Sequence, residues 1–478
     1  MAYTIVIASR YLIPLFLYLF LSCSIYALFV GDVRKQSGAA ALQMVFLFLM
    51  QFTAWLTIVI RTQQSKYLLF YAFLQILTLA LPVLAWFIYP GISRIVMNHM
   101  CMLFSAGLIV LTRLDLTKAI KQLIIAGASF VVFLIVPWIL RKCRFLEKLG
   151  WIYAGIGIAA LGIVLILGQV THGSKLSWSI GGITFQPSEF VKVCFIYVGA
   201  STLSRLMAKR NIVLFIAYSA VICACLALMK DFGTAIIFFV AFLVIAFLRS
   251  GNFATIALAI AATGFAGVLV LRFLPYARNR FEAWGHVWDY ALTTGYSQTR
   301  SMMCIASGGL FGLGPGKGWL KYVAASDTDL VFAFVSEEWG LIMAVLMVAC
   351  IVILACFVVR SAPAGRSCFY TIGACAAVTV MVTQTILNVF GMADFLPLTG
   401  VTFPFVSNGG SSMVCVWGLL AFIKAADTRQ NASVAIRVPH GVTPLPEEPD
   451  AEEDAVDEPA AEDPDAVWQR PAGKEACR

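Results

Sequence analysis

Apolar stretches of about 20 residues, separated by short polar connections, repeat along most of this chain of 478 residues. A helix of about that length crosses the hydrocarbon core of a lipid bilayer. The pattern therefore predicts an all-α fold and a polytopic helical membrane protein. The 13 predicted spans are residues 11–30, 42–61, 66–89, 95–112, 119–140, 150–169, 188–207, 211–229, 232–248, 254–273, 331–359, 367–391 and 410–425.

The composition supports this class. The chain is 61% hydrophobic and 12% charged, whereas a soluble domain is roughly half apolar and a quarter charged. The run 11–30 is long and no small-residue cleavage site follows it, so it is assigned as a span and not as a signal peptide. Most of the 13 cysteines lie inside apolar runs and none forms a C-x-x-C pair. We expect buried apolar residues, not metal ligands or disulfides.

Basic residues are concentrated in alternate loops from residue 95 onward. They are Arg141, Lys142, Arg144 and Lys148, then Arg205, Lys209 and Arg210, then Arg249, then Arg360 and Arg366. Short cytoplasmic loops are enriched in Lys and Arg, so these loops and the C-terminus are expected in the cytoplasm. Segments 170–187, 274–330 and 392–409 then share the outer face. Three spans before residue 95 place the N-terminus outside as well, unless one of them is re-entrant.

The net charge of +9 hides an asymmetry between the tail and the rest of the chain. From Glu447 onward there are 12 acidic and 3 basic residues, which leaves 13 acidic and 31 basic residues elsewhere. The basic residues are scattered between spans and form no stripe, so no nucleic-acid partner is expected. Three parts are predicted: extra N-terminal spans (1–94), a membrane core (95–430) and a disordered, acidic, Pro-rich cytoplasmic tail (431–478).

The 57-residue loop 274–330 has the densest polar chemistry in the chain. Functional residues often lie on loops of this kind. Its start contains Arg280, a candidate anion contact, and its glycine-rich middle contains Lys317. That middle does not match a Walker A motif, which needs four residues between its glycines and Ser or Thr after the Lys. Its backbone N–H groups can still bind an anion.

The loop ends in Ser326-Asp327-Thr328-Asp329. Ser326 and Asp329 have the spacing of a capping box at a helix start. Asp329 can alternatively act as a general base, which requires at least one free carboxylate oxygen because full engagement in capping lowers the pKa. The sequence leaves both interpretations open.

Two further segments place ionisable residues at span boundaries. Glu189 and Lys192 can pair at i,i+3 on a helix that starts at Pro187. Lys175, just before them, can meet an anionic headgroup or a diphosphate at the outer interface. Asp231 begins the next apolar run and has either a structural or a functional role.

The stretch 388–412 is apolar but is broken by prolines and glycines. Irregular backbone at membrane depth is tolerated where it lines a cavity inside the protein. The stretch therefore favours a binding site beside the large loop.

Five segments, in this order, resemble sequence blocks of the SEDS family (shape, elongation, division and sporulation; the FtsW, RodA and SpoVE types). They are FQPSEFVK, KDFGTA, GYSQTRS with SGGLFGLGPGKG, SDTDLVFAFVSEEWG and LPLTGVTFPFVSNGGSS. The resemblance covers roughly residues 95–430. It implies a ten-span core that polymerises lipid II into glycan strands at the outer face of the bacterial inner membrane. The implied partner is a class B penicillin-binding protein of a division or elongation complex. The three N-terminal spans exceed the usual ten.

The resemblance places the family's essential loop aspartate on Asp329, in a block that usually reads like HTDFIFA. Asp327 replaces the usual His, and Asn408 stands in SNGG where SYGG is common. The usual Trp before QPSE is also displaced by one position, to Trp178. The blocks supply the remaining candidate substrate contacts, which are Gln186, Gln298, Ser407, Gly409, Gly410 and Ser411.

The implied reaction needs a base for a sugar hydroxyl and cations for a lipid diphosphate leaving group. Asp329 is the candidate base. Candidate diphosphate contacts are Lys175, Arg280 and Lys317, and Glu189, Lys192 and Asp231 are candidate substrate contacts. A divalent cation, Mg or Mn, is an optional cofactor. A lipid II flippase, or a non-catalytic scaffold of the division or elongation machinery, is the alternative.

Overall fold

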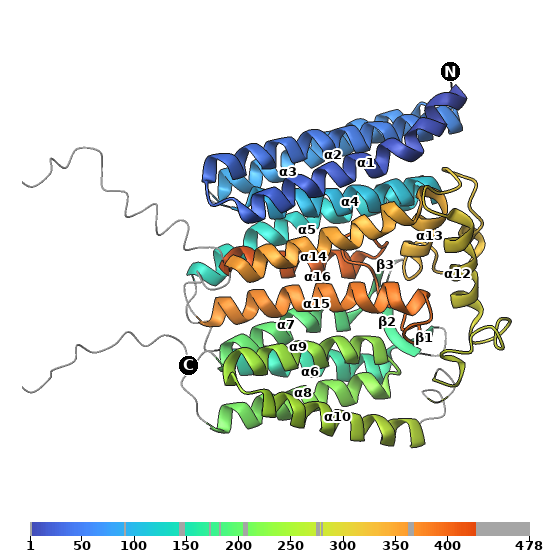
Figure 1. The fold of residues 1–478 in the computed structure, drawn as a ribbon. Coiled ribbons are helices and arrows are strands. Elements are labelled where there is room, and N and C mark those ends of the chain that lie inside the picture. The colour runs from blue at the N-terminus through green and yellow to red at the C-terminus, as the bar shows by residue number, and fades with distance from the viewer. Residues whose placement is uncertain are drawn as a thin grey trace, which may run out of the picture.

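The computed structural model confirms the predicted helical membrane fold. It describes residues 2–426 except 90–91, 143–148, 172–173, 181–182, 204–208, 274–277, 279–280 and 362–367. The long helices lie side by side in one bundle, and the first three helices cover one edge of it (Figure 1). The predicted acidic tail, 431–478, lies outside the described residues.

The long helices correspond to the 13 predicted spans. They are α1 (Ala2–Phe29), α2 (Val33–Thr62), α3 (Lys66–Ile88), α4 (Arg94–Leu114), α5 (Leu116–Lys142), α6 (Gly150–Leu167), α7 (Pro187–Leu203), α8 (Lys209–Leu228), α9 (Phe232–Ser250), α10 (Phe253–Phe273), α14 (Leu341–Ser361), α15 (Cys368–Met392) and α16 (Gly410–Ala426). Most ends fall within about four residues of the prediction, but α1 and α2 begin nine residues early. Within the described residues, ten helices are long and apolar enough to cross a membrane.

Helices α4 and α15 form the interior of the bundle. In their most apolar windows 94% and 78% of residues are buried, against 28–44% in the other candidate spans. Beside them, Trp417 of α16 packs against the rings of Phe130 and Phe133 of α5, with centroids 5.7 Å apart in both pairs. The outer helices instead expose many large apolar side chains, as expected for surfaces that face lipid.

The three N-terminal helices pack on this core as complete helices. Helix α1 contacts α2 and α14, and α2 contacts α4. Two hydrogen bonds between buried side chains join α2 to α4: Gln51 Nε2 to Ser105 Oγ at 2.6 Å, and Asn98 Nδ2 to Gln43 Oε1 at 3.1 Å. Such bonds stabilise helix association in lipid, where apolar burial alone does not distinguish helix from lipid.

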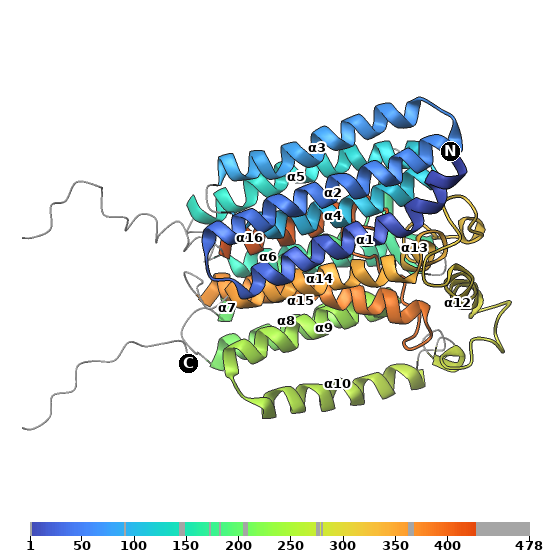
Figure 2. The ribbon, with the colours of Figure 1, turned by 45° about the horizontal axis from the view of Figure 1, so that its top comes forward.

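The start of α1 lies at the same end of the bundle as the segment 281–330 (Figure 2). There the guanidinium of Arg10 donates hydrogen bonds to the carbonyls of Phe311 and Gly312. The ring of Tyr11 lies 4.8 Å from that of Phe311. The odd number of N-terminal helices that the sequence predicted is therefore present, and it brings α1 into contact with the large loop.

The segments 169–185 and 281–330 contain more regular structure than the sequence predicted. Residues expected as loop form a three-stranded antiparallel sheet: β1 (Gln169–Thr171), β2 (Ser174–Ile180) and β3 (Ile183–Phe185). The large loop contains α12 (Tyr296–Gly308) and a 3-10 turn (Leu320–Tyr322). These elements are short and only weakly periodic, so hydropathy did not separate them from loop.

The predicted span 331–359 is wrong in one respect. It is two helices, α13 (Val331–Trp339) and α14 (Leu341–Ser361), separated by Gly340. Gly340 has φ +97°, and a Cβ there would lie 2.3 Å from the carbonyl oxygen of Leu310. The break therefore depends on a neighbour about 30 positions earlier in the chain, which a local apolar pattern does not reveal.

Gly312 allows a test of how tightly the large loop packs on α13. Its φ is +76°, and a Cβ there would lie 2.4 Å from the carbonyl oxygen of Glu338, whereas Gly285 has φ +78° and nothing within 4 Å. Both Gly→Ala variants carry the cost of a left-handed residue, about 1–2 kcal/mol. We expect Gly312→Ala to lower the unfolding temperature in detergent by several degrees more than Gly285→Ala. Equal shifts would show that the loop yields at Gly312.

Candidate active site

The short helix α13 lies at the end of the bundle that carries α12 (Figure 1). Each of its residues is buried, and Glu337 and Glu338 are fully shielded from solvent. A buried ionised carboxylate is costly unless hydrogen bonds or an opposite charge compensate it. The surrounding chain therefore has to supply hydrogen bonds or an opposite charge to each of these two glutamates.

The segment after the glycine-rich run supplies the partners of Glu337. The backbone N–H groups of Trp319 and Leu320 donate to its two carboxylate oxygens at 2.7 and 3.0 Å. The N–H of Leu313, within the run, donates to the main-chain carbonyl of Glu337 at 2.8 Å. The sequence predicted that N–H groups of this region bind an anion. The anion they bind in the structure is a carboxylate of the chain itself.

The second glutamate, Glu338, faces the end of α4. Arg113 Nε lies 3.6 Å from Glu338 Oε2. Burial raises the pKa of the Glu338 carboxyl above its usual range, and the charge of Arg113 opposes that rise. Gly316 packs against the same guanidinium, because a Cβ there would lie 2.8 Å from Arg113 Nη2. Helices α4 and α13 and the glycine-rich run thus share one charged contact.

Asp329 lies in a tight turn that leads into α13. The backbone N–H groups of Thr328, Asp329 and Leu330 all donate to the carbonyl of Ala325, at 3.1–3.2 Å. The predicted capping box is wrong, because α13 has Leu330 as its N-cap and no side-chain capping bond there. The N-cap is thus one residue past Asp329 and the helix begins at Val331, so Asp329 is not the residue that caps α13.

Two distant segments hold this turn from the other side. The side-chain amide of Asn388, on α15, donates to the carbonyl oxygens of Asp329 at 2.9 Å and of Val401 at 2.7 Å. The hydroxyl of Ser407 donates to the carbonyl oxygen of Thr328 at 2.5 Å. The irregular segment after α15 is therefore packed directly against the turn. The binding site that the sequence predicted beside the large loop stays a prediction.

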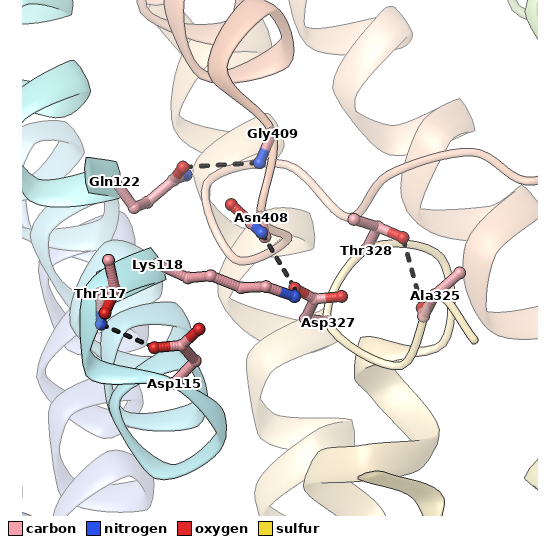
Figure 3. Close-up of polar contacts among 9 residues, drawn as sticks. All are labelled: Asp115, Thr117, Lys118, Gln122, Ala325, Asp327, Thr328, Asn408 and Gly409. Carbon is pink, nitrogen blue, oxygen red and sulfur yellow. Dashed lines mark hydrogen bonds and ion pairs between the residues drawn. The ribbon is translucent and has the colours of Figure 1, made fainter. Parts of the chain in front are cut away.

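The side chains of Lys118 and Asn408 meet at the carboxylate of Asp327 (Figure 3). Lys118 Nζ, near the start of α5, lies 2.7 Å from Asp327 Oδ2. Asn408 donates its side-chain amide to the same oxygen at 2.9 Å and its backbone N–H to the Asp327 carbonyl at 2.8 Å. Asp327 and Asn408 are two of the positions where the chain departs from the sequence blocks it resembles. The structure brings them into direct contact, and we call the three residues the Lys118–Asp327–Asn408 clamp.

One turn further along α5, Gln122 continues this contact. Its amide oxygen accepts a hydrogen bond from the backbone N–H of Gly409 at 3.4 Å, and its amide N–H donates to the Ser407 carbonyl at 3.4 Å. The side chain of Asp329 is partly exposed, and its Oδ2 would lie 3.3 Å from a Cβ at Gly400. Of the predicted site residues, the structure thus brings Asp329, Ser407 and Gly409 together.

A second charged group lies inside the bundle, between α7 and the start of α9. The predicted pair is present: Lys192 Nζ lies 2.7 Å from Glu189 Oε1, and both side chains are buried. Asp231 is the N-cap of α9 and accepts a hydrogen bond from the Thr234 N–H at 3.1 Å. Glu189 Oε2 and Asp231 Oδ2 accept no hydrogen bond within the described part of the chain. The group holds two carboxylates and one ammonium. This arrangement is compatible with a structural role and with a functional role of Asp231, the two roles that the sequence left open.

The remaining predicted residues occupy several places. Gln298 is buried and donates to the carbonyl of Gly391, which ties α12 to the end of α15. Gln186 donates to Ser188, Lys317 is exposed, and Gly410 begins α16 with Ser411 after it. The side chain of Lys175 and all of Arg280 lie outside the described residues. Within this set, Gly410 and Ser411 follow Gly409 directly in the chain.

The sequence analysis missed Lys118, Gln122 and Asn388. Lys118 and Gln122 are four residues apart at the start of a span, so they lie on one face of α5. That spacing was a readable signal. Asn388 lies in the segment 388–412, which the sequence singled out. The two carbonyl oxygens that accept its hydrogen bonds, however, lie about 60 positions earlier and 13 positions later in the chain. Among the described residues, no three His, Cys, Asp or Glu side chains are grouped to hold a metal ion.

Comparison with known proteins gives one family. A family model described as a cell cycle protein of the FtsW, RodA and SpoVE group matches residues 88–432. Peptidoglycan glycosyltransferase RodA of Mycobacterium leprae is 25% identical over 384 residues, which cover 74% of this chain and 82% of that protein. Stage V sporulation protein E of Bacillus subtilis is 29% identical over 318 residues, covering 61% and 82%.

Solved structures show the same fold. The crystal structure of the rod shape determining protein RodA of Thermus thermophilus aligns with a TM-score of 0.53 at 18% identity, covering 70% of this chain and 96% of that one. A chain from a study of how a peptidoglycan synthase complex coordinates polymerization and crosslinking aligns with a TM-score of 0.57 at 21% identity, covering 70% and 97%.

The buried pair of α7 allows a test of its electrostatics. Removing one partner of a buried ion pair typically costs about 3–5 kcal/mol, because the other charge remains without its partner. We expect Lys192→Met to lower the unfolding temperature in detergent clearly, and Glu189→Gln with Lys192→Met to lower it less. A double variant at least as unstable as the sum of the single variants would contradict this account.

Proposed function

The chain belongs to the FtsW/RodA/SpoVE family of cell cycle proteins, and we propose that it is a peptidoglycan glycosyltransferase. Relatives across much of its length carry that name. The proposed substrate is lipid II, which the enzyme polymerises into glycan strands. The observation that carries the proposal is the turn at Asp329, which places a partly exposed carboxylate where α5, α13, α15 and the segment 401–409 converge.

Asp329 is the proposed general base. A hydroxyl of one lipid-linked glycan attacks the anomeric carbon of another, and the proton of that hydroxyl passes to the Asp329 carboxylate. The new glycosidic bond forms as the bond from the anomeric carbon to the lipid diphosphate breaks. Such a base must be held in a fixed place relative to its substrate. The hydrogen bonds of Asn388 and Ser407 to this turn support that requirement.

Cations would bind the diphosphate leaving group. Lys317 is exposed on the loop, and the Lys118 side chain is about half exposed although it is paired with Asp327. Lys175 and Arg280 remain proposed contacts on sequence grounds. We assign Lys118 a positioning role through the clamp, because its ammonium contacts Asp327.

The proposed orientation puts this site outside the cytoplasmic membrane. The basic loops of the sequence favour a cytoplasmic location for the opposite end of the bundle and for the C-terminus. A class B penicillin-binding protein, acting as the crosslinking enzyme, is the proposed partner. The fold match to a chain from a peptidoglycan synthase complex supports that choice.

One observation favours a second function, movement of lipid II across the membrane. Glu189, Lys192 and Asp231 are buried inside the bundle, where charged groups often serve transport. The polymerase is preferred because the partly exposed Asp329 lies at the end of the bundle and is held there by contacts from several distant segments.

The base assignment is tested by Asp329→Asn in polymerisation of purified lipid II with the partner present. Loss of one positioned base should lower the rate about 10²–10⁴-fold. Asp115→Asn is the matched control, because Asp115 lies on the same face, is exposed, and retains its hydrogen bond from Thr117 N–H as asparagine. A wild-type rate for Asp329→Asn would refute the assignment. Lipid II flipping by reconstituted protein, scored in parallel, separates the two functions.

The clamp gives a second prediction. We expect Lys118→Met to lower kcat about tenfold with a smaller change in KM, and Lys118→Arg to retain most of the rate. Adding Asp327→Asn to Lys118→Met should cost little more, because the two residues act as one unit. Lys121→Met, an exposed lysine three positions later, is the control. Losses of rate that add in the double variant would contradict the positioning role. A lower stability of the variants with an unchanged rate would contradict it as well.

A further inference from the structure

A cavity of about 210 Å³ lies at the end of the bundle opposite Asp329. Its wall joins the N-terminal helices to the core, since Ala27 of α1 and Gln36 of α2 face residues of α4, α5, α14 and α16 across it. The helices α1 and α2 therefore supply part of its wall. The sequence assigned those helices no role.

The charged lining of the cavity is of one sign. Arg360 at the end of α14 and Lys424 at the end of α16 both line it, and no acidic residue is among the described residues of the lining. Arg94 follows the lining residue Ser93 and reaches Ser37 Oγ at 3.2 Å, which adds a third positive charge nearby. Coulombic attraction between these cations and an anion is strengthened where water is scarce.

The rest of the lining is suited to a phosphate ester on an apolar stem. Ser93 supplies a hydroxyl at the charged side. Gln36 and Ser361 also line it, but their side chains donate to the carbonyls of Val30 and Val358. Phe133 and Phe357 supply an apolar wall. The volume is below the roughly 300–1,000 Å³ of pockets for drug-sized ligands, so it holds a headgroup while any long chains lie outside against the helices.

We propose that this cavity binds the phosphate headgroup of an anionic membrane lipid. Basic pockets between membrane helices on the cytoplasmic side commonly bind such headgroups. Here the site would also join two parts of the chain, because the guanidinium of Arg360 donates to the carbonyl of Leu28 at the end of α1. A bound phosphate next to Arg360 and Lys424 would neutralise the core side of that junction. The proposal does not depend on the reaction at Asp329.

The test is native mass spectrometry of the full chain purified in detergent. It is incubated with phosphatidylglycerol, with phosphatidylcholine or with inorganic phosphate alone. A further incubation holds phosphatidylglycerol and inorganic phosphate together. We expect phosphatidylglycerol to bind at least tenfold more tightly than phosphatidylcholine, and inorganic phosphate to compete only weakly. Arg360→Gln should weaken phosphatidylglycerol binding about tenfold. Arg34→Gln is the control, because it removes the same charge from an exposed position at this end of the bundle.

A second variant keeps the test decisive if loss of Arg360 unfolds the protein. Ser93→Phe adds a ring to the lining without removing a charge, and it should displace the headgroup while the chain stays folded by thermal unfolding. Equal binding of the two lipids, or unchanged binding in Arg360→Gln or Ser93→Phe, would overturn the proposal. Phosphate that binds as tightly as the lipid would identify a site for free phosphate and would equally overturn it.

Discussion

Two glutamates buried in one short helix constrain the end of the bundle that carries the large loop. Glu337 and Glu338 are fully shielded from solvent, and burial of unpaired carboxylates is too costly for a stable fold. The chain after the glycine-rich run therefore turns so that the N–H groups of Trp319 and Leu320 reach Glu337. Arg113 reaches Glu338 from α4. Once α13 is held in this way, the turn at its start has one position, and that turn carries Asp329.

The turn itself is held by segments far apart in the chain. Lys118 comes from α5, Asn388 from α15, and Ser407 and Asn408 from the segment before α16. Each contact is a single hydrogen bond or ion pair of modest net strength. Together these contacts fix the position of the turn, because they hold adjacent residues from different directions. A rigid turn of this kind suits a catalytic group more than a mobile gate, which agrees with the proposed transferase over the alternative transporter.

The N-terminal helices connect the two ends of the molecule. Arg10 of α1 contacts the large loop at one end, and the end of α1 meets Arg360 beside the basic cavity at the other. The family model begins at residue 88, so most of this α1–α3 layer lies outside the matched core. Its polar contacts with α4, through Gln51 and Asn98, show a specific helix interface. The layer is therefore a built part of the fold and shapes surfaces at both ends.

The sequence alone determined the membrane class, the 13 long helices, the Glu189–Lys192 pair and Asp329 as the candidate base. These follow from local regularities: apolar length, i,i+3 spacing and a recognisable sequence block. Only the tertiary structure decided that Gly340 divides a predicted span, that Leu330 and not Ser326 is the N-cap of α13, and that Lys118 and Asn408 meet at Asp327. Each of these depends on a contact between segments distant in the chain. Hydropathy and propensity describe a residue's neighbours in sequence, whereas burial, close backbone approach and ion pairing depend on its neighbours in space.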